Sequence, residues 1–438
     1  MNFSKQLVPL SIGSLLLSVL FTTNASAATL NWEKLYGGGF NKGSGMMTED
    51  VGYFNGFFTG QWNDLSMRHS DGTIILGANP GSLKPNSFRS YLIKPDGKLK
   101  NTVMNSPVAF AETSDKGVLV IKDTSSFKTQ NFTLVKYQNS NLKPMWAIPI
   151  KTTNAKNSLS TISTVAVSSN AYFAAGTEYV PGENWGIQPV LWKFDTKGKL
   201  LGTKVLAEVA SDLQVNAVKV LADNTVITAG FKNNSQGSAT AWIVALNQNQ
   251  EKLWEKTYGC SEAASDITIM PDGNVAIASN VFTSYSTDPA IWNTATGRTF
   301  WSTRLTVLRS TDGEFMDERI IQGAFPTETL ADLCSSTPVV PNNLIPSPVS
   351  FKTTALETTL DGGYMLVGTK SSNVAPIQPK SNHVWVRKLD ANFNLAWEQE
   401  FASTDNQYGA NVSEITLGKY LVSGVKQNGQ RVLRMITE

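Results

Sequence analysis

Hydrophobic and polar residues alternate in short runs along this chain, and the clearest set of runs lies between Leu360 and Phe401. Three runs occur there, each led by turn or loop residues: Tyr364 to Gly368, Val384 to Leu389 and Leu395 to Phe401. A fourth run precedes them at about Ser350 to Thr358. Because the side chains of a β-strand point alternately to its two faces, this pattern predicts four short antiparallel strands.

Weaker copies of this four-strand unit recur through the rest of the chain. They cover Gln61–Met104, Pro107–Ile150, Ser158–Leu206, about Asp212–Tyr258 and Ala264–Thr306. Asp-Gly pairs such as Asp71-Gly72 and Asp272-Gly273 recur in register between apolar runs, as tight hairpin turns require. Units of four strands repeated at roughly 45 to 55 residues predict an all-β fold, the β-propeller.

The two ends of the chain each contain part of a unit. After Phe401 there is room for three strands only, at about Gly409–Thr416, Tyr420–Gly424 and Arg431–Ile436. Near the N-terminus, Leu30 to Tyr36 matches the fourth strand of the other units but has no unit of its own. Unpaired strand edges are avoided when a ring closes, so we predict a seven-bladed propeller whose N-terminal strand completes the C-terminal blade. The alternatives are an open ring, or eight blades with a further unit within Gly37–Gly60 or Arg309–Pro346.

Tryptophan recurs at fixed places in these units. In the fifth unit we expect Ala290-Ile291-Trp292 in the third strand and Gly297–Leu305, with Trp301, in the fourth. The tryptophans of the other units fall in the same two strands: Trp192, Trp242 and Trp385 in the third, and Trp32, Trp146, Trp254 and Trp397 in the fourth. Large rings at repeated positions favour packing between neighbouring blades over stacking on a sugar or a base.

The first 27 residues have the features of a secretory signal peptide. Lys5 precedes the apolar run Leu7–Phe21, and Ala25-Ser26-Ala27 supplies the small residues of a cleavage site. The alternative is a membrane anchor, but the apolar run is short for one and is interrupted. We therefore expect residues 28–438 to form a single secreted or periplasmic propeller domain, with an insertion at about 309–346 and no membrane span.

The charge of the chain bears on its partners, and its cysteine content bears on its compartment. The chain has 37 basic and 35 acidic residues, so nothing favours nucleic acid as a partner. Cys260 and Cys334 are the two cysteines, and in an oxidising compartment we expect them to form a disulfide that holds the insertion, the alternative being two separate buried thiols. Two cysteines and two histidines are too few and too scattered for a zinc site.

The repeated unit, Asp361-Gly362-Gly363-Tyr364 followed by Trp385 to Asp390 and Trp397, resembles bacterial secreted β-propeller repeats that are loosely quinoprotein-like. In that group the turn into the outer strand often carries Asp-x-x-Thr-Gly followed by Trp. The nearest match here is Asn293 to Trp301, with Asn in place of Asp. The resemblance covers nearly all of the chain and implies the propeller fold, which hosts enzymes, scaffolds and binding modules alike.

Candidate catalytic residues are few, and we assign no catalytic residue, cofactor or metal ligand. His69 and His383 sit beside a hairpin turn and in a regular strand, positions that favour structural roles. The acid pairs Glu49-Asp50 and Asp317-Glu318 would serve glycoside chemistry only with another carboxylate at the right distance. The alternative to a binding module is a quinone-dependent dehydrogenase or a hydrolase, and visible absorption by a bound quinone would discriminate the first.

Long connections point to where function lies. In a propeller, the connections after the second and fourth strands emerge on one face, and this chain places nearly all of its long segments there. Rigid scaffolds usually carry binding surfaces on such loops. We therefore expect a monomer that binds a protein or glycan partner through this face, with these candidate anchors: Phe54, Phe57, Phe58, Tyr179, Trp185 and Tyr285.

Overall fold

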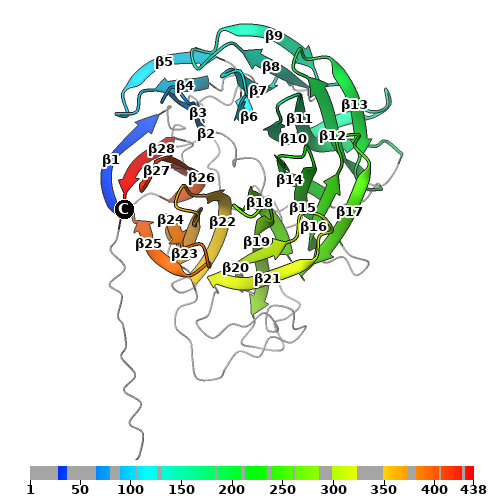
Figure 1. Cartoon of the computed structure of the whole chain (residues 1–438). Coiled ribbons are helices and arrows are strands. Elements are labelled where there is room, and N and C mark those ends of the chain that lie inside the picture. Colours follow the sequence, from blue (N-terminus) through cyan, green and yellow to red (C-terminus); the bar gives the residue numbers. More distant parts are fainter. Residues whose placement is uncertain are drawn as a thin grey trace, which may run out of the picture.

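The computed structural model describes most of the chain as strands and tight turns. The described residues are 28–36, 66–78, 89–104, 107–125, 131–182, 186–208, 213–233, 239–259, 262–285, 298–322, 349–372, 381–403, 406–426 and 430–438. Within these ranges they form seven four-stranded antiparallel sheets that follow one another around a central axis in chain order (Figure 1). The fold is therefore the predicted seven-bladed β-propeller.

Each blade begins with a strand beside the central axis and ends with a strand at the outer rim (Figure 1). Blade one contains β2 (Ser66–Arg68), β3 (Ile74–Ala78), β4 (Arg89–Ile93) and β5 (Leu99–Met104). Blade two contains β6 (Pro107–Glu112), β7 (Val118–Asp123), β8 (Phe132–Tyr137) and β9 (Pro144–Pro149). Blade three contains β10 (Ser158–Val167), β11 (Ala171–Tyr179), β12 (Ile187–Asp195) and β13 (Leu200–Val205). Blade four contains β14 (Leu213–Val220), β15 (Val226–Asn233), β16 (Ala239–Leu246) and β17 (Lys252–Tyr258).

The remaining three blades include the one that closes the ring. Blade five contains β18 (Glu262–Ile269), β19 (Val275–Tyr285), β20 (Arg298–Leu308) and β21 (Phe315–Gln322). Blade six contains β22 (Val349–Thr358), β23 (Tyr364–Ser372), β24 (Ser381–Leu389) and β25 (Leu395–Phe401). Blade seven contains β26 (Gln407–Thr416), β27 (Lys419–Lys426), β28 (Arg431–Thr437) and, from the other end of the chain, β1 (Thr29–Tyr36). Trp32 lies opposite Met435 in this last pair, which confirms the predicted closure.

Blade five differs from the prediction. Trp301 lies in β20, which pairs with both β19 and β21 and is therefore the third strand, so its placement in the fourth strand was wrong. The fourth strand is β21, within the segment expected as an insertion from residue 309; residues 323–346 of that segment, and Trp292, lie outside the described residues. The quinoprotein-like motif therefore ends at the start of the third strand and is not at the turn into the outer strand.

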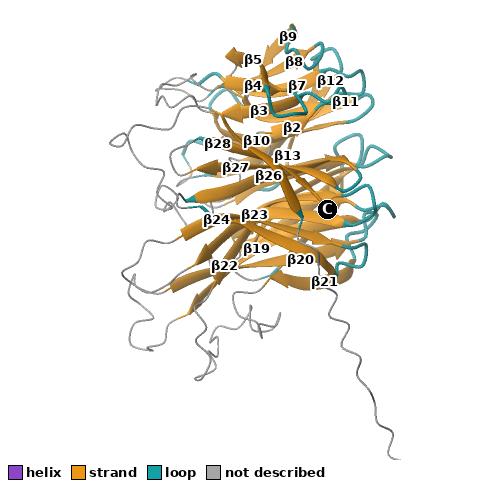
Figure 2. Cartoon of the chain, turned by 90° about the vertical axis from the view of Figure 1, so that its left-hand side faces the viewer, coloured by secondary structure: helices purple, strands orange, loops and turns teal. Residues whose placement is uncertain are grey.

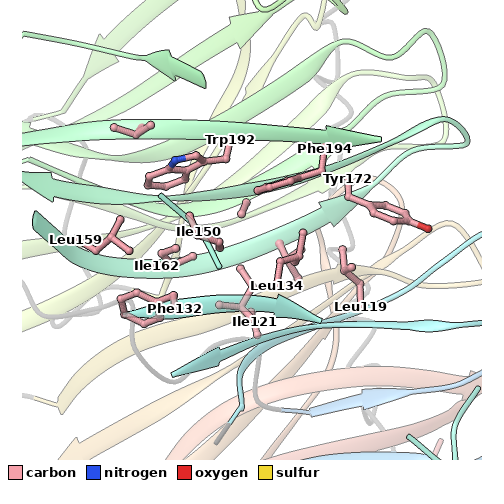
Figure 3. Close-up of a cluster of buried hydrophobic side chains, with 14 residues drawn as sticks. Leu119, Ile121, Phe132, Leu134, Ile150, Leu159, Ile162, Tyr172, Trp192 and Phe194 are labelled. Atoms are coloured by element: carbon pink, nitrogen blue, oxygen red, sulfur yellow. The ribbon is translucent and has the colours of Figure 1, made fainter. Parts of the chain in front are cut away.

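Hydrophobic side chains fill the spaces between neighbouring blades. Figure 3 shows the cluster between blades two and three, where Leu119, Ile121 and Leu134 face Tyr172, Trp192 and Phe194. The third-strand residues Trp192, Trp242 and Trp385 are fully buried, and the fourth-strand Trp254 and Trp397 are nearly so. Packing between blades is thus the role of these rings, as their repeated positions predicted.

The inner strands of blades two to seven each contain a β-bulge at a matching place. In three of them the bulged residue donates a hydrogen bond to a backbone carbonyl of the next blade's inner strand: Ser163 Oγ to Val215 at 2.5 Å, Asn216 Nδ2 to Ala264 at 2.7 Å and Thr354 Oγ1 to Gly409 at 3.1 Å. Bulges re-aim side chains out of the regular ladder. Here they direct polar groups sideways and fasten successive blades around the axis.

Candidate functional site

The two faces of the propeller differ in their connections (Figure 2). The turns after first and third strands are short and hydrogen-bonded, as in Gly72 N to the His69 carbonyl at 2.8 Å and Gly362 N to the Thr359 carbonyl at 2.9 Å. We call this side the tight-turn face. The second and fourth strands all end on the opposite side, the long-loop face. This division agrees with the sequence prediction.

Of the predicted anchors, the structure describes the side chain of Tyr179. It ends β11 on the long-loop face and is 38% exposed. Tyr285 ends β19 on the same face, but its side chain is outside the described residues. Phe54, Phe57, Phe58 and Trp185 also lie outside them, as do Cys260 and Cys334.

The residue before Tyr179 organises the surface around it. Glu178 is completely buried, and its carboxylate accepts hydrogen bonds from the Thr153 backbone N at 2.6 Å and from Thr153 Oγ1 at 2.6 Å. Asn157 Nδ2 at 3.0 Å and Gln188 Nε2 at 3.1 Å donate to the same carboxylate. A buried carboxylate is stable when several donors satisfy it. Glu178 therefore fixes the connection between β9 and β10 against β11 and β12.

A second contact holds the start of that connection. Trp192, buried in β12, donates from Nε1 to the Lys151 carbonyl at 2.9 Å. The connection 150–157 therefore has an ordered backbone, and most of its side chains face solvent, including Lys151, Asn154 and Lys156. We call these residues together with Tyr179 the blade-three platform. It presents amide, hydroxyl and ammonium donors beside one aromatic ring, a combination suited to polar protein surfaces and to sugars.

Both histidines belong to networks that join strands. His69 is buried at the tight-turn face, and its Nε2 lies 2.9 Å from the Lys116 carbonyl of the next blade. His383 Nδ1 contacts Glu400, whose other oxygen accepts from Lys370 at 2.6 Å. In blade four, Lys232 and Trp242 both donate to one carboxylate oxygen of Glu255, each at 2.8 Å. The Glu400 and Glu255 networks connect the second, third and fourth strands of their blades near the long-loop face.

Glu318, one of the predicted acid candidates, pairs with Arg304. The same guanidinium donates to the buried Glu262 at 2.8 Å, while Asp317 pairs with Arg319 at 2.8 Å. Burial raises the pKa of Glu262 to about 7, although Arg304 opposes the shift. Glycoside hydrolysis needs an open gap for the sugar between two carboxylates. Here Arg304 binds both, so the arrangement acts as an ion-pair clamp between strands.

A cavity of about 280 Å³ opens in the central channel, lined by the inner strands of blades two to five. Two of its three charged side chains, Asp266 and Glu112, also join blades. Asp266 accepts from its own strand at Ile267 N, 2.8 Å, and from blade six at Leu356 N, 2.9 Å. Glu112 accepts from Ser70 N of blade one at 2.7 Å. In the part of the chain that the structure describes, no three His, Cys, Asp or Glu side chains are grouped as a metal site would require.

Buried and paired carboxylates give a prediction for stability against pH. Burial raises the pKa of Glu357 to about 8 and that of Glu262 to about 7, above the usual 4.5. Burial alone would also raise the pKa of Asp361, but the Lys388 bond and two further bonds lower it to about 2. In the folded protein, Glu357 and Glu262 hold protons that they release in the unfolded chain, so the free energy of unfolding falls as pH rises from about 4.5 to 8. Asp361 has the opposite effect, because its lowered pKa makes the free energy of unfolding fall as pH drops below 3.8. Urea unfolding should therefore show greatest stability near pH 4 to 5.

The variant Glu357→Gln separates this effect from other titrations. It removes the ionisation, so its stability should decline less than that of the wild type between pH 5 and 8. Stability that rises through this range in the wild type would contradict the assignment.

Comparison with known proteins identifies no family and finds distant structural likenesses. No protein-family model matches the chain, and no curated protein matches its sequence. Among solved structures, the N-terminal domain of Nup159 is 10% identical with a TM-score of 0.44, covering 94% of this chain and 96% of that one. A PQQ-bound aldose sugar dehydrogenase from Streptomyces coelicolor is 9% identical with a TM-score of 0.38, covering 76% and 95%. A mannose phosphorylase from Leishmania mexicana is 10% identical with a TM-score of 0.32, covering 65% and 85%.

The structure also bears on membrane crossing. Within the described ranges, no helix has the length and apolar character needed to cross a bilayer.

Proposed function

We propose that this protein is a non-enzymatic β-propeller that binds a protein or glycan partner through its long-loop face. The observation that carries the proposal is the blade-three platform, in which a completely buried carboxylate holds an exposed connection in place. Binding costs less entropy when the contacting groups are ordered beforehand. The Glu178 network gives this advantage to residues 150–157 before any partner arrives.

Tyr179 is the anchor of the proposed site. Its ring follows the buried Glu178 directly and is exposed at the strand end, so its position is set by the sheet. Tyrosine offers a large apolar area and a hydroxyl with few rotatable bonds, which suits the centre of a binding surface. Lys151, Asn154 and Lys156 then supply donors around it.

The proposed setting is the periplasm or the cell exterior. The support is the signal-like segment at Lys5, Leu7–Phe21 and Ala25-Ser26-Ala27.

Photo-crosslinking tests this proposal. A benzophenone-bearing residue is placed at Tyr179 or Lys156 in the full-length protein, expressed in the native cell and illuminated. We expect both positions to yield the same adduct, either a second protein or a glycan, identified by mass spectrometry.

Lys143 on the tight-turn face provides the matched control, because it is exposed but lies on the opposite side from Lys156. A partner other than the protein itself that reacts at Lys143 and at neither platform position would overturn the proposal. An unreacted platform in cells where the protein is abundant would also overturn it.

A further inference from the structure

Among the described residues, nine of the fourteen exposed large apolar side chains lie at the tight-turn ends of their strands or in the tight turns. The two most exposed of these nine are Leu360 at 71% and Leu417 at 69%, in the turns after the first strands of blades six and seven. These turns are neighbours, since Leu360 N donates to Glu414 of blade seven. A further exposed residue lies at the beginning of each fourth strand around the rim: Leu30, Leu99, Met145, Leu200, Leu253, Phe315 and Leu395. Contiguous exposed apolar groups mark an interaction site, and Leu360 and Leu417 stand on neighbouring turns.

Charge divides the same face into two halves. The turns of blades one to three carry exposed lysines: Lys94, Lys98, Lys116, Lys143, Lys197 and Lys199. The turns of blades five to seven carry exposed or half-buried carboxylates: Asp272, Asp312, Glu314, Asp361, Asp390 and Glu438. Because the blades follow one another around the ring, these halves lie on opposite sides of the axis (Figure 1).

Some of these charges have neighbours of opposite sign. Asp96 pairs with Lys98 at 3.3 Å, Asp115 with the buried Lys136 at 2.6 Å, and Arg309 with both Asp312 and Glu314. Asp71, Asp195 and Glu112 add negative charge to the basic half, while Lys419, Arg319 and the buried Lys388, which pairs with Asp361 at 2.8 Å, add positive charge to the acidic half. The lysines still outnumber the acids in the first half, and the acids outnumber the bases in the second.

In place of the monomer expected from the sequence, we propose that two copies of this chain associate through their tight-turn faces, around a two-fold axis that runs along the line between the basic and acidic halves. Such a rotation places each basic half on the partner's acidic half. Blade three then faces blade five of the other copy, blade two faces blade six, and blade one faces blade seven. The contact is isologous and closed, as in most symmetric dimers.

The charge division also selects this occupant over a lipid surface. An anionic membrane would attract blades one to three but repel the carboxylates of blades five to seven. A second copy satisfies both halves at once and covers Leu360 and Leu417 together with the rim residues. In this dimer the two blade-three platforms point away from each other, so partner binding through the long-loop face stays open.

Charge reversal at the blade three to blade five contact tests the dimer. Lys199 and Glu314 occupy equivalent places, each directly before an exposed apolar residue that begins a fourth strand. One variant carries Lys197→Glu and Lys199→Glu, and the other carries Glu314→Lys. By sedimentation equilibrium we expect a dimer for the wild type, monomers for each variant alone, and recovery of a dimer when the two variants are mixed.

Controls separate a lost interface from a lost fold. Lys151→Glu with Lys156→Glu makes a similar charge change on the long-loop face and should leave the dimer intact. Leu360→Ser with Leu417→Ser should give a monomer with an unchanged melting temperature, because both side chains already face solvent. Raised salt should weaken the wild-type dimer. A wild type that is monomeric at its highest soluble concentration, or variants that dimerise alone, would overturn the proposal.

Discussion

Deletion of residues 28–36 is expected to unfold the propeller near room temperature or to lower its melting temperature by well over ten degrees. These residues include β1, which pairs along β28 from Thr29 to Tyr36. Trp32 packs against the cluster between blades seven and one, and Glu33 pairs with the buried Arg434 at 2.7 Å. Losing a half-buried tryptophan and the carboxylate that pairs with the buried Arg434 each costs up to about 3–5 kcal/mol, against a typical total of about 5–15.

Two controls accompany the deletion. Removal of residues 1–27 alone leaves β1 in place and should not change the melting temperature. A synthetic peptide of residues 28–36 should restore part of the lost stability when added to the shortened protein, because the vacated strand edge is a template for pairing. Equal melting temperatures for the shortened and full-length proteins would show that β1 does not close the ring.

Gly230→Ala is expected to destabilise the protein by about 3 kcal/mol, a large effect for one methyl group. A Cβ at Gly230 would lie 1.8 Å from the Gln214 carbonyl oxygen and 3.0 Å from the Val215 Cα. These are backbone atoms of the inner strand beside the bulge, so β14 must shift. The shift would also disturb the Asn216 bond to Ala264 in the next blade.

Gly202→Ala is the matched control for this substitution. Its added Cβ meets only the end of the Gln250 side chain, at 2.6 Å, which can move aside. Thermal unfolding of both variants should show a clear drop for Gly230→Ala and little change for Gly202→Ala. Equal melting temperatures would contradict the role assigned to the glycine opposite the bulge.

The propeller architecture could be predicted from the sequence because the repeated unit is marked by turns, and local chemistry determines each turn. Asp361-Gly362-Gly363 forms the tight turn before β23. Gly368 ends the motif Asp-Gly-Gly-Tyr-x-x-x-Gly, and a Cβ at this position would lie 2.1 Å from the Lys352 carbonyl oxygen. Blade five broke the pattern. Its outer strand begins with Phe315-Met316 and lacks the tryptophan found in the outer strands of blades two, four, six and seven, so Trp301 was assigned to the wrong strand.

The candidate site could be predicted from the sequence only in part, because its residues come from separate segments. Tyr179 stood out as an aromatic residue beside a loop, but Glu178 gave one local signal only, a carboxylate in a strand of small and apolar residues. Its partners Thr153 and Gln188 come from other segments, and only the folded blade shows that they meet. The charge halves of the tight-turn face likewise emerge when distant turns are arranged around one axis.

The measurement that tests the central claim most directly is the affinity of the crosslinked partner for purified wild type and for Tyr179→Ala, by titration calorimetry. Val205→Ala is the control, since Val205 is 39% exposed at a strand end on the same face, close to the 38% of Tyr179. We predict at least about tenfold weaker binding for Tyr179→Ala, unchanged binding for Val205→Ala and equal melting temperatures for all three proteins. Equal affinity of the wild type and Tyr179→Ala would contradict the assignment of the binding site to the blade-three platform.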